Sequence, residues 1–487
     1  MAVLESIFTK ALTAPNKTAV ITDGRVIGYR AYAAAIVRMR RFMEAQAIDR
    51  DQVAILCVGE LASGWIIGLA LRSLGVTTVH ARTLEDVERL GFAAFTVVSS
   101  DVEVWPGLAA VAVRVGARCI EAPSALYARD APTIALDQEA PVLAVRPGGQ
   151  ILLTSGTTGV NKKVLIDPAF EAQSMALRAD IYGLTGASVV NLFDFGGWTV
   201  AGYQTPISVW GQGGAVMWHQ GPDRWRSLTA RDVTLAYTQP AMLASLLDAP
   251  AEAELRNDAM TVIVGAGVLS QADWRAARDR LTSDIRTSYG STEAGPCALT
   301  RIETHEDLVW HQIHPAFEVQ VVDDQHQPTP AGGTGAVRVR TSGVDGYLAD
   351  AATTRAFFRD GFFYPGDLGM LREDGRLQIL GRVTDVINVM GDKIATTPIE
   401  RSLQAALGAK AVCVFSAPGE SGVEEVHVVI EPGEPVSQEA LKAALRAALP
   451  RVRAVRFHAV TSFARNQMGK IDRLALRARL APGPGQG

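Results

Sequence analysis

At 487 residues, with 48% hydrophobic and 20% charged residues, the chain is too long for one ordinary core and too apolar for extensive disorder. We therefore expect a folded protein of at least two domains. Its formal net charge of −4 gives no electrostatic reason to bind nucleic acid or an anionic membrane, and we expect neither as a partner.

The cysteine pattern and the apolar segments favour a cytoplasmic enzyme. The cysteines stand singly, without a CxxC pair, which argues against a disulfide framework or a zinc site. The first residues contain Glu5 and no unbroken apolar run, so we expect no signal peptide. The most apolar helical pattern, residues 64–76, is short and contains Arg72, which indicates a buried helix and not a membrane span.

The first half of the chain alternates helical and strand patterns, which is typical of α/β units with a largely parallel sheet. Helices are predicted over residues 32–47, 64–74 and 84–90. Short apolar strands are predicted over residues 53–58, 77–80, 95–99, 151–153, 189–192, 215–218 and 261–264.

The pattern changes from Glu318 onwards. Alternating strands over residues 317–323 and 335–340 flank the turn-rich stretch QHQPTPAGG, which predicts an antiparallel β section. Two further strands, residues 411–415 and 426–431, precede a helix over 437–448 and indicate a compact α+β unit.

We therefore expect a large N-terminal domain over residues 1–382, built of α/β subdomains and a β section. A boundary at 383–384 separates it from a small C-terminal α+β domain over 385–487.

The segment LLTSGTTGVNKK, residues 152–163, carries the strongest chemical signal. Glycines and hydroxyl residues after a strand can wrap a triphosphate with backbone N–H groups and hydroxyls, and Lys162 adds positive charge. The pattern is not GxxxxGK[ST], because Asn161 stands where that motif needs glycine, so a P-loop kinase or GTPase is disfavoured. The alternative is an ordinary polar loop. The candidate phosphate-binding residues are Thr154, Ser155, Gly156, Thr157, Thr158, Gly159 and Lys162.

This loop resembles the phosphate-binding signature of the adenylate-forming superfamily, which includes acyl-CoA synthetases, peptide-synthetase adenylation domains and beetle luciferases. The family pattern has proline in place of Asn161, and glycine and histidine in place of Lys163 and Pro168. These departures weaken inference of the substrate class more than they weaken inference of ATP binding.

Two further segments extend the resemblance. GAGVL at residues 265–269 resembles the loop against which the family's adenine lies, and glycine lets the backbone approach a flat ring. YGSTEAG at residues 289–295 resembles the next signature, and its alternative is a strand-end turn with an exposed acid. Mg²⁺ takes one or two carboxylates plus phosphate oxygens, so one glutamate is enough. The resemblance implies nucleotide contacts at Gly265, Ala266, Gly267, Tyr289, Gly290 and Ser291, with Thr292 contacting phosphate and Glu293 acting toward Mg²⁺.

The ribose and hinge signatures follow in order. YPGDLG at residues 364–369 resembles the ribose site, in which Asp367 would accept hydrogen bonds from both ribose hydroxyls. Arg382 would add a contact to ribose or phosphate through its planar donors. The alternative for these two residues is a surface ion pair. Val383 and Thr384 would form the hinge, where the family often has Asp or Lys at the second position.

NQMGKIDR at residues 466–473 resembles the family's C-terminal lysine motif, in which Lys470 would be catalytic. Attack of a carboxylate on the α-phosphate builds negative charge, and an ammonium aimed there stabilises that charge. A lysine in a basic C-terminus would otherwise be a surface residue. The resemblance further implies that the small domain is mobile and brings the loop around Met390 and Gly391 to the site for the second step.

NLFDFGGW at residues 191–198 occupies the place of the family's variable substrate motif, and predicts a pocket that includes Phe193, Asp194, Gly197 and Trp198. Many acyl-CoA synthetases have histidine where this chain has Asp194. In amino-acid adenylation domains an aspartate after a phenylalanine contacts the substrate ammonium. The alternative is a hydrogen-bonded aspartate at a strand end. The aromatic residues suit an aryl or medium-sized acid, or core packing.

The sequence therefore predicts an ATP- and Mg²⁺-dependent, AMP-forming ligase acting on a small carboxylic acid. The acyl group would pass from its adenylate to the thiol of coenzyme A or of a separate phosphopantetheinyl carrier protein. Two alternatives stay open: transfer of the acyl group to an amine, and a catalytically inactive homologue that serves in binding.

Overall fold

The fold is seen in a computed structural model. It describes residues 2–22, 25–100, 105–128, 134–136, 147–154, 161–219, 224–229, 232–250, 253–389, 392–418, 424–433, 436–449, 452, 455–465 and 471–480. Several predicted site residues lie outside this described part of the chain. They are Ser155, Gly156, Thr157, Thr158, Gly159, Met390, Gly391 and Lys470.

The first large sheet is mostly parallel, as the alternating pattern predicted. Its strand order is β6-β5-β3-β4-β7-β8, and only the β7–β8 pair is antiparallel. Residues 54–57 of the central strand β3 are all buried, as expected for a parallel sheet that is covered by helices on both faces. The strands are β3 (Val53–Cys57), β4 (Thr77–His80), β5 (Phe95–Ser99), β6 (Arg118–Glu121), β7 (Gln150–Thr154) and β8 (Lys162–Ile166).

The second large sheet has the order β14-β13-β12-β11-β9-β10-β1-β2, with antiparallel pairs only at its two edges. The predicted strands over residues 189–192, 215–218 and 261–264 are all found in it. The strands are β1 (Thr18–Thr22), β2 (Arg25–Gly28), β9 (Val189–Asn191), β10 (Ala215–Trp218), β11 (Leu235–Thr238), β12 (Thr261–Val264), β13 (Asp284–Ser291) and β14 (Gly295–Arg301).

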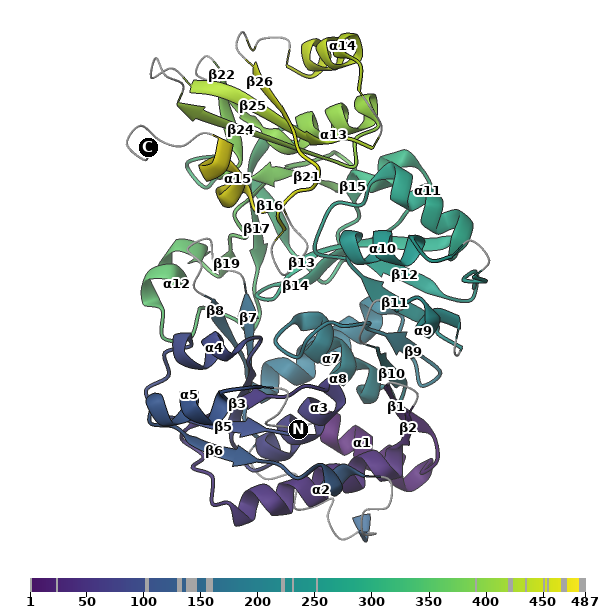
Figure 1. The fold of residues 1–487 in the computed structure, drawn as a ribbon, viewed down its shortest axis with the longest axis vertical. Helices are drawn as coiled ribbons and strands as arrows, with labels where there is room; N and C mark the ends of the chain where they lie inside the picture. The colour runs from purple at the N-terminus through teal and green to yellow at the C-terminus, as the bar shows by residue number, and fades with distance from the viewer. Residues whose placement is uncertain are drawn as a thin grey trace.

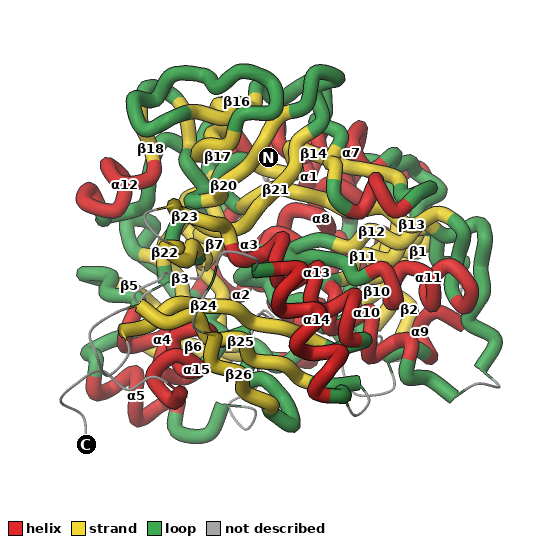
Figure 2. Tube along the Cα trace, turned by 90° about the horizontal axis from the view of Figure 1, so that it is seen from above, coloured by secondary structure: helices red, strands yellow, loops and turns green. Residues whose placement is uncertain are grey.

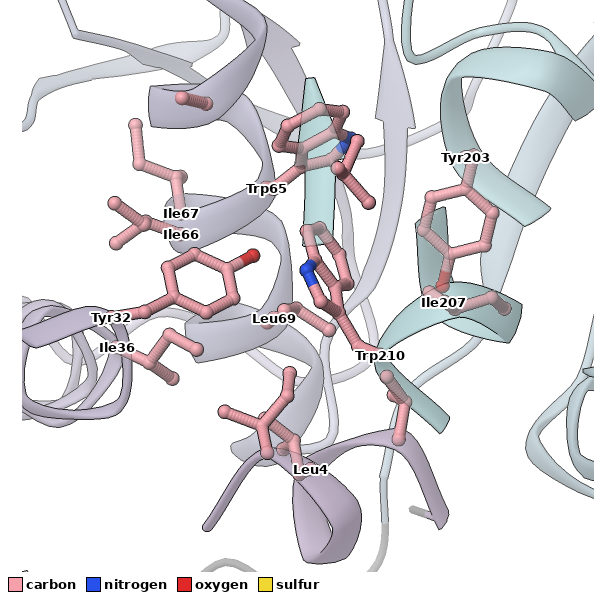
Figure 3. Packing of buried hydrophobic residues seen from close by; sticks show 14 of the residues in the cluster. Leu4, Tyr32, Ile36, Trp65, Ile66, Ile67, Leu69, Tyr203, Ile207 and Trp210 are labelled. Carbon is pink, nitrogen blue, oxygen red and sulfur yellow. The ribbon is translucent and has the colours of Figure 1, made fainter. Parts of the chain in front are cut away.

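Helices between the two sheets form the main core. The apolar helix α3 (Leu61–Ser73) is buried along its whole length, and no helix in the described residues is long and apolar enough to cross a membrane. Trp210 lies at the centre of this core, between Tyr32 and Trp65 (Figure 3). The other helices around it are α1 (Ala2–Thr13), α2 (Tyr29–Ala45), α7 (Pro168–Tyr182) and α8 (Val200–Gly211).

A third sheet is antiparallel throughout, which confirms the predicted β section. It connects the α/β layers to the C-terminal part of the chain (Figure 1). Its strands are β15 (Trp310–His311), β16 (Val319–Val322), β17 (Thr334–Arg340), β18 (Phe358–Arg359), β19 (Phe362–Phe363), β20 (Asp367–Leu371) and β21 (Leu377–Arg382). Short helices flank the sheets: α4 (Leu84–Arg89), α5 (Leu108–Arg114), α9 (Arg226–Thr229), α10 (Pro240–Leu247), α11 (Gln271–Arg280) and α12 (Ala351–Phe357).

The C-terminal residues form an α+β unit with its own apolar cluster around Leu403, Val414, Val428 and Ile430. Helix α13 packs against β24 and also contacts β21, and Figure 2 shows this unit from above with α13 and α14 beside strands β24 to β26. Its elements are β22 (Val386–Val389), β23 (Asp392–Ala395), α13 (Thr396–Leu407), β24 (Ala411–Pro418), β25 (Glu424–Glu431), α14 (Gln438–Ala448), β26 (Val455–Ala459) and α15 (Arg473–Leu480).

Trp210→Phe should lower the stability of the protein by about 2 kcal/mol, because it removes buried ring area from the core. It also removes the hydrogen bond of 3.0 Å that the indole N–H donates to the Ala19 carbonyl. Thermal unfolding followed by circular dichroism measures the change. Val113→Ala, at a side chain that is 80% exposed, is the control and should leave the unfolding midpoint unchanged. An equal midpoint for both variants would contradict the central packing role of Trp210.

Candidate nucleotide site

The predicted phosphate loop joins two antiparallel strands, β7 and β8. Thr154 at the end of β7 lies opposite Lys162 at the start of β8. The two strands form a hairpin whose connecting residues, 155–160, lie outside the described part of the chain. The Thr154 hydroxyl oxygen is buried and has no hydrogen-bond partner in the described part of the chain. Because a buried hydroxyl without a partner is costly, this orphaned group fits a ligand oxygen at the loop.

Lys162 is held by aromatic rings. Its Nζ lies 3.3 Å from the centroid of the Phe357 ring and 5.0 Å from that of Tyr347. Burial lowers the pKa of Lys162, while the nearby Glu293 carboxylate acts in the opposite direction. The ring faces attract the ammonium and fix its place beside the hairpin.

Glu293 is linked to the same aromatic cluster. Its side chain is buried at 6% exposure, and its Oε1 accepts a hydrogen bond of 2.7 Å from the Tyr347 hydroxyl. Burial, followed by the Glu293 charge, raises the pKa of Tyr347, so the phenol stays a donor. Lys162, Tyr347 and Glu293 therefore form one connected unit of a cation, a donor and an anion.

The motif search did not identify Tyr347 or Phe357. Both lie in a segment that follows the third sheet's strand β17, far in sequence from Lys162. No spacing in the sequence could connect them with the phosphate loop, and only their distances to Lys162 and Glu293 identify them.

Glu293 offers a metal ion one carboxylate. Among the described residues, no group of three His, Cys, Asp or Glu side chains is arranged to hold a metal ion. A Mg²⁺ ion at Glu293 would thus take its remaining ligands from water and from the oxygens of a bound phosphate, which is the coordination that Mg²⁺ prefers.

The predicted ribose residues lie together. Asp367 in β20 pairs in register with Arg382 in β21, and Arg382 Nη1 lies 3.2 Å from Asp367 Oδ1. The Tyr289 hydroxyl donates a hydrogen bond of 2.8 Å to Asp367 Oδ2. Two predicted nucleotide residues, Tyr289 in β13 and Arg382 in β21, thus converge on the carboxylate of a third, Asp367 in β20.

The ring of Tyr289 is stacked on a neighbour as well. His311 lies nearly parallel to it, with 6.2 Å between ring centroids. Burial lowers the pKa of His311 to about 4, so this imidazole is neutral at physiological pH. It supports the tyrosine ring by packing.

The predicted adenine loop follows β12 directly. A Cβ atom on Gly265 would come within 2.4 Å of the Tyr237 hydroxyl, and one on Gly267 within 3.0 Å of Pro240. Ala266 between them adopts a positive φ of 61°, a conformation that side chains other than glycine rarely adopt. The close contacts explain why this turn needs glycine at position 265.

The predicted substrate motif follows β9. Phe193 is fully buried with a positive φ of 50°, and Asp194 pairs with Arg224 at 3.3 Å. In this structure the Asp194 carboxylate is already paired with the Arg224 guanidinium, and no substrate is bound to it. Contact between Asp194 and a substrate ammonium therefore stays a prediction. Motif reasoning did not identify Arg224.

A buried histidine lies against the same motif. A Cβ atom on Gly197 would come within 2.7 Å of the His80 ring, so glycine at this position makes room for the imidazole. Burial lowers the pKa of His80 to about 4, and the ring is therefore neutral. His80 comes from the end of β4 in the first sheet, so this contact joins the two large sheets beside the predicted substrate motif.

The predicted hinge residues follow β21. Val383 is 42% exposed, and its N–H donates to the Gly366 carbonyl at 2.9 Å. The Thr384 hydroxyl donates to the Asp385 carboxylate at 3.3 Å. Their role as a hinge stays a prediction.

The family of the chain follows from comparison with known proteins. The sequence profile of the family described as AMP-binding enzyme matches residues 7–348. The chain belongs to this family. The predicted resemblance and the prediction of an AMP-forming carboxylate ligase are confirmed at this level.

Individual relatives agree with this membership. Triostin synthetase I from Streptomyces triostinicus is 27% identical, over 88% of this chain and 91% of that protein. A salicylyl-CoA synthase / salicylate adenylyltransferase from Streptomyces sp is 29% identical, over 67% of this chain and 62% of that protein. The structure of ATP-bound MatB from Rhodopseudomonas palustris superposes with a TM-score of 0.82 at 23% identity, over 98% of both chains, and confirms the mixed α/β fold.

Tyr347→Phe should raise the Mg²⁺ concentration needed for half-maximal nucleotide-dependent activity about 10-fold, because Glu293 loses the donor that orients it. Titration of Mg²⁺ at fixed ATP measures the shift. Tyr364→Phe, at a phenol that contacts Arg338 and His326, is the control and should keep the wild-type Mg²⁺ dependence. The same half-maximal concentration in both variants would mean that Tyr347 does not position Glu293.

Proposed function

We propose that this protein adenylates a small carboxylic acid with ATP and passes the acyl group to a phosphopantetheine thiol, either in coenzyme A or on a separate carrier protein. The observation that carries the proposal is the position of the segment from Tyr289 to Glu293. Its first residue contacts Asp367, and its last contacts Tyr347 beside Lys162. One short turn thus connects the candidate ribose residue with the candidate phosphate residues.

The residues around this turn fit a nucleotide with its metal ion. The Thr154 hydroxyl, which has no partner among the residues that the structure describes, and the Lys162 ammonium offer a donor and a charge to phosphate oxygens. We assign a phosphate contact to Thr292 as well. Glu293 would hold Mg²⁺, which when bound neutralises part of the triphosphate charge. Asp367 and Arg382 would contact the ribose.

The chemistry follows in two displacements. A carboxylate oxygen of the acid attacks the α-phosphorus of ATP, and the bond to pyrophosphate breaks. Lys162 and Lys470 stabilise the negative charge that develops on the phosphate oxygens. A thiolate then attacks the acyl carbon of the adenylate, and the bond to AMP breaks. Adenylation replaces a poor leaving group by AMP, which departs readily.

The proposal divides the chain into residues 1–382, a hinge at 383–384, and residues 385–487. Rotation about Val383 and Thr384 would withdraw Lys470 after the first step and present the loop around Met390 and Gly391 for the second. The exposed side chain of Val383 and the separate apolar cluster of the C-terminal unit support this division. Four free cysteines support a reducing, cytoplasmic location.

The test is ATP–pyrophosphate exchange with a panel of aryl, fatty, small dicarboxylic and amino acids. Exchange that depends on one class of acid is expected, since adenylation is reversible until the acceptor arrives. Adding coenzyme A, a phosphopantetheinylated carrier or an amine to the active acid then shows which acceptor releases AMP. Nucleotide binding without exchange for any acid would contradict the proposal and favour the inactive binding homologue.

Lys470→Ala should lower the exchange rate at least about 100-fold, because the variant loses a charge that acts on the developing phosphate oxygens. Thioester formation from a supplied acyl-adenylate should change little, because that step breaks no bond to pyrophosphate. Lys442→Ala, elsewhere in the C-terminal unit, is the control for both steps. Equal losses in the two half-reactions would contradict the assigned role of Lys470.

A further inference from the structure

Arg473, the first residue of α15, contacts three other segments of the C-terminal unit. Its Nη2 donates to Glu400 Oε2 at 2.8 Å, and its Nη1 donates to the Val414 carbonyl at 3.1 Å. Its Nε lies 3.3 Å from Asp385 Oδ2. These partners come from α13, from β24, which lies beside α15 (Figure 1), and from the segment between β21 and β22. Every nitrogen of the guanidinium thus has a partner, which the planar fork of arginine makes possible.

The Glu400 carboxylate makes this anchor strong. Its side chain is 9% exposed, and the oxygen that Arg473 does not use, Oε1, accepts a hydrogen bond of 2.7 Å from the Val414 N–H. Burial raises the pKa of Glu400, and the charge of Arg473 opposes that rise. Since a buried carboxylate needs a cation beside it, the two side chains stabilise each other's charged forms and fix the start of α15 against α13 and β24.

Asp385 connects the same network with the predicted hinge. It directly follows Thr384, whose hydroxyl donates to Asp385 Oδ1 at 3.3 Å. The Asp385 N–H donates to the Arg382 carbonyl at 3.0 Å, and the Asp385 carbonyl accepts from the Thr396 N–H at 3.2 Å. The residue that Arg473 binds is therefore held by the end of β21 on one side and by the start of α13 on the other.

The lysine motif lies on the other side of the network. Arg473 is the last residue of NQMGKIDR and follows Lys470 by three residues. Between them, Ile471 forms a β-bridge with Arg465 and packs against the apolar cluster of β24, β25 and α15. Because three residues of chain reach about 11 Å at most, the place of Arg473 limits where Lys470 can be.

We propose that Arg473 is a positioning residue for adenylation. By binding Asp385 and Glu400, it fixes the start of α15, and with it the lysine motif, relative to the hinge. The partners all lie on the C-terminal side of residues 383–384, so rotation there would keep their contacts and bring Lys470 to the same place in each catalytic cycle. Loss of the anchor would misplace the ammonium and slow the step that needs its charge. The inference rests on the proposed function and names a residue that supports it.

The test measures two half-reactions in Arg473→Gln: ATP–pyrophosphate exchange, and acyl transfer from a supplied acyl-adenylate. Pyrophosphate exchange should fall about 10-fold or more, because a small displacement of a catalytic group is costly, while acyl transfer should change little. Acyl transfer needs a folded C-terminal unit, so its retention separates positioning from loss of the fold. Arg479→Gln, at an exposed position of the same helix, is the matched control and should leave both half-reactions unchanged.

Two further variants keep a cation beside Glu400 and so guard the test against misfolding. Asp385→Asn removes only the contact nearest the hinge, and should lower pyrophosphate exchange less than Arg473→Gln does. Arg473→Lys keeps the charge without the planar fork, and should recover part of the exchange rate. Equal losses in the two half-reactions of Arg473→Gln, or wild-type pyrophosphate exchange in Arg473→Gln or Asp385→Asn, would overturn the inference while leaving adenylation intact.

If pyrophosphate exchange is absent with every acid, the proposed function fails, and amide hydrogen exchange followed by mass spectrometry decides the anchor by itself. Arg473→Gln should then speed amide exchange in residues 383–389 and 471–480 together, because both segments lose their shared contact. Arg479→Gln should speed it in neither. Faster exchange in residues 471–480 alone, or in no segment, would show that Arg473 does not tie the lysine motif to the hinge and would overturn the inference.

Discussion

The Asp367 carboxylate joins two segments that the motifs predict to contact the nucleotide. It accepts a hydrogen bond from Tyr289 at the end of β13 and pairs with Arg382 at the end of β21. These contacts fix the edge of the parallel sheet against the antiparallel sheet. Because Glu293 follows Tyr289 by only four residues, anchoring the tyrosine also places the glutamate. A substitution that freed Tyr289 would therefore disturb the candidate ribose and metal positions at once.

Tyr347 likewise links two predicted site residues near the phosphate loop, because it lies between the Lys162 ammonium and the Glu293 carboxylate. Its ring faces Lys162 and its hydroxyl donates to Glu293. Without this arrangement the ammonium and the carboxylate could form a direct ion pair, and neither would be available to a triphosphate or its metal ion. An aromatic ring attracts the cation more weakly than a carboxylate does, so Lys162 is oriented and its proposed contact with phosphate would not require it to leave an ion pair with Glu293.

Buried charge gives a second constraint on this fold. Arg72 and Arg178 lie at one interface, yet Glu171 compensates only the first. The cost of the second charge is reduced by a glutamine oxygen and a tyrosine hydroxyl. Asp194 and Arg224 form a further ion pair, which lies at the predicted substrate motif.

The sequence by itself determined the elements and the chemical types of the site residues. Short apolar runs at residues 77–80, 215–218 and 261–264 form strands because burial on both faces of a sheet requires apolar side chains. Motif order predicted Lys162, Glu293, Asp367 and Arg382 as site residues, since each chemical role needs a particular side chain at a particular turn. Only the tertiary structure revealed the contacts of Tyr347, Phe357 and Arg224 with predicted site residues. Those contacts join residues far apart in the chain, and no local pattern encodes them, because the packing of separate sheets decides which distant side chains meet.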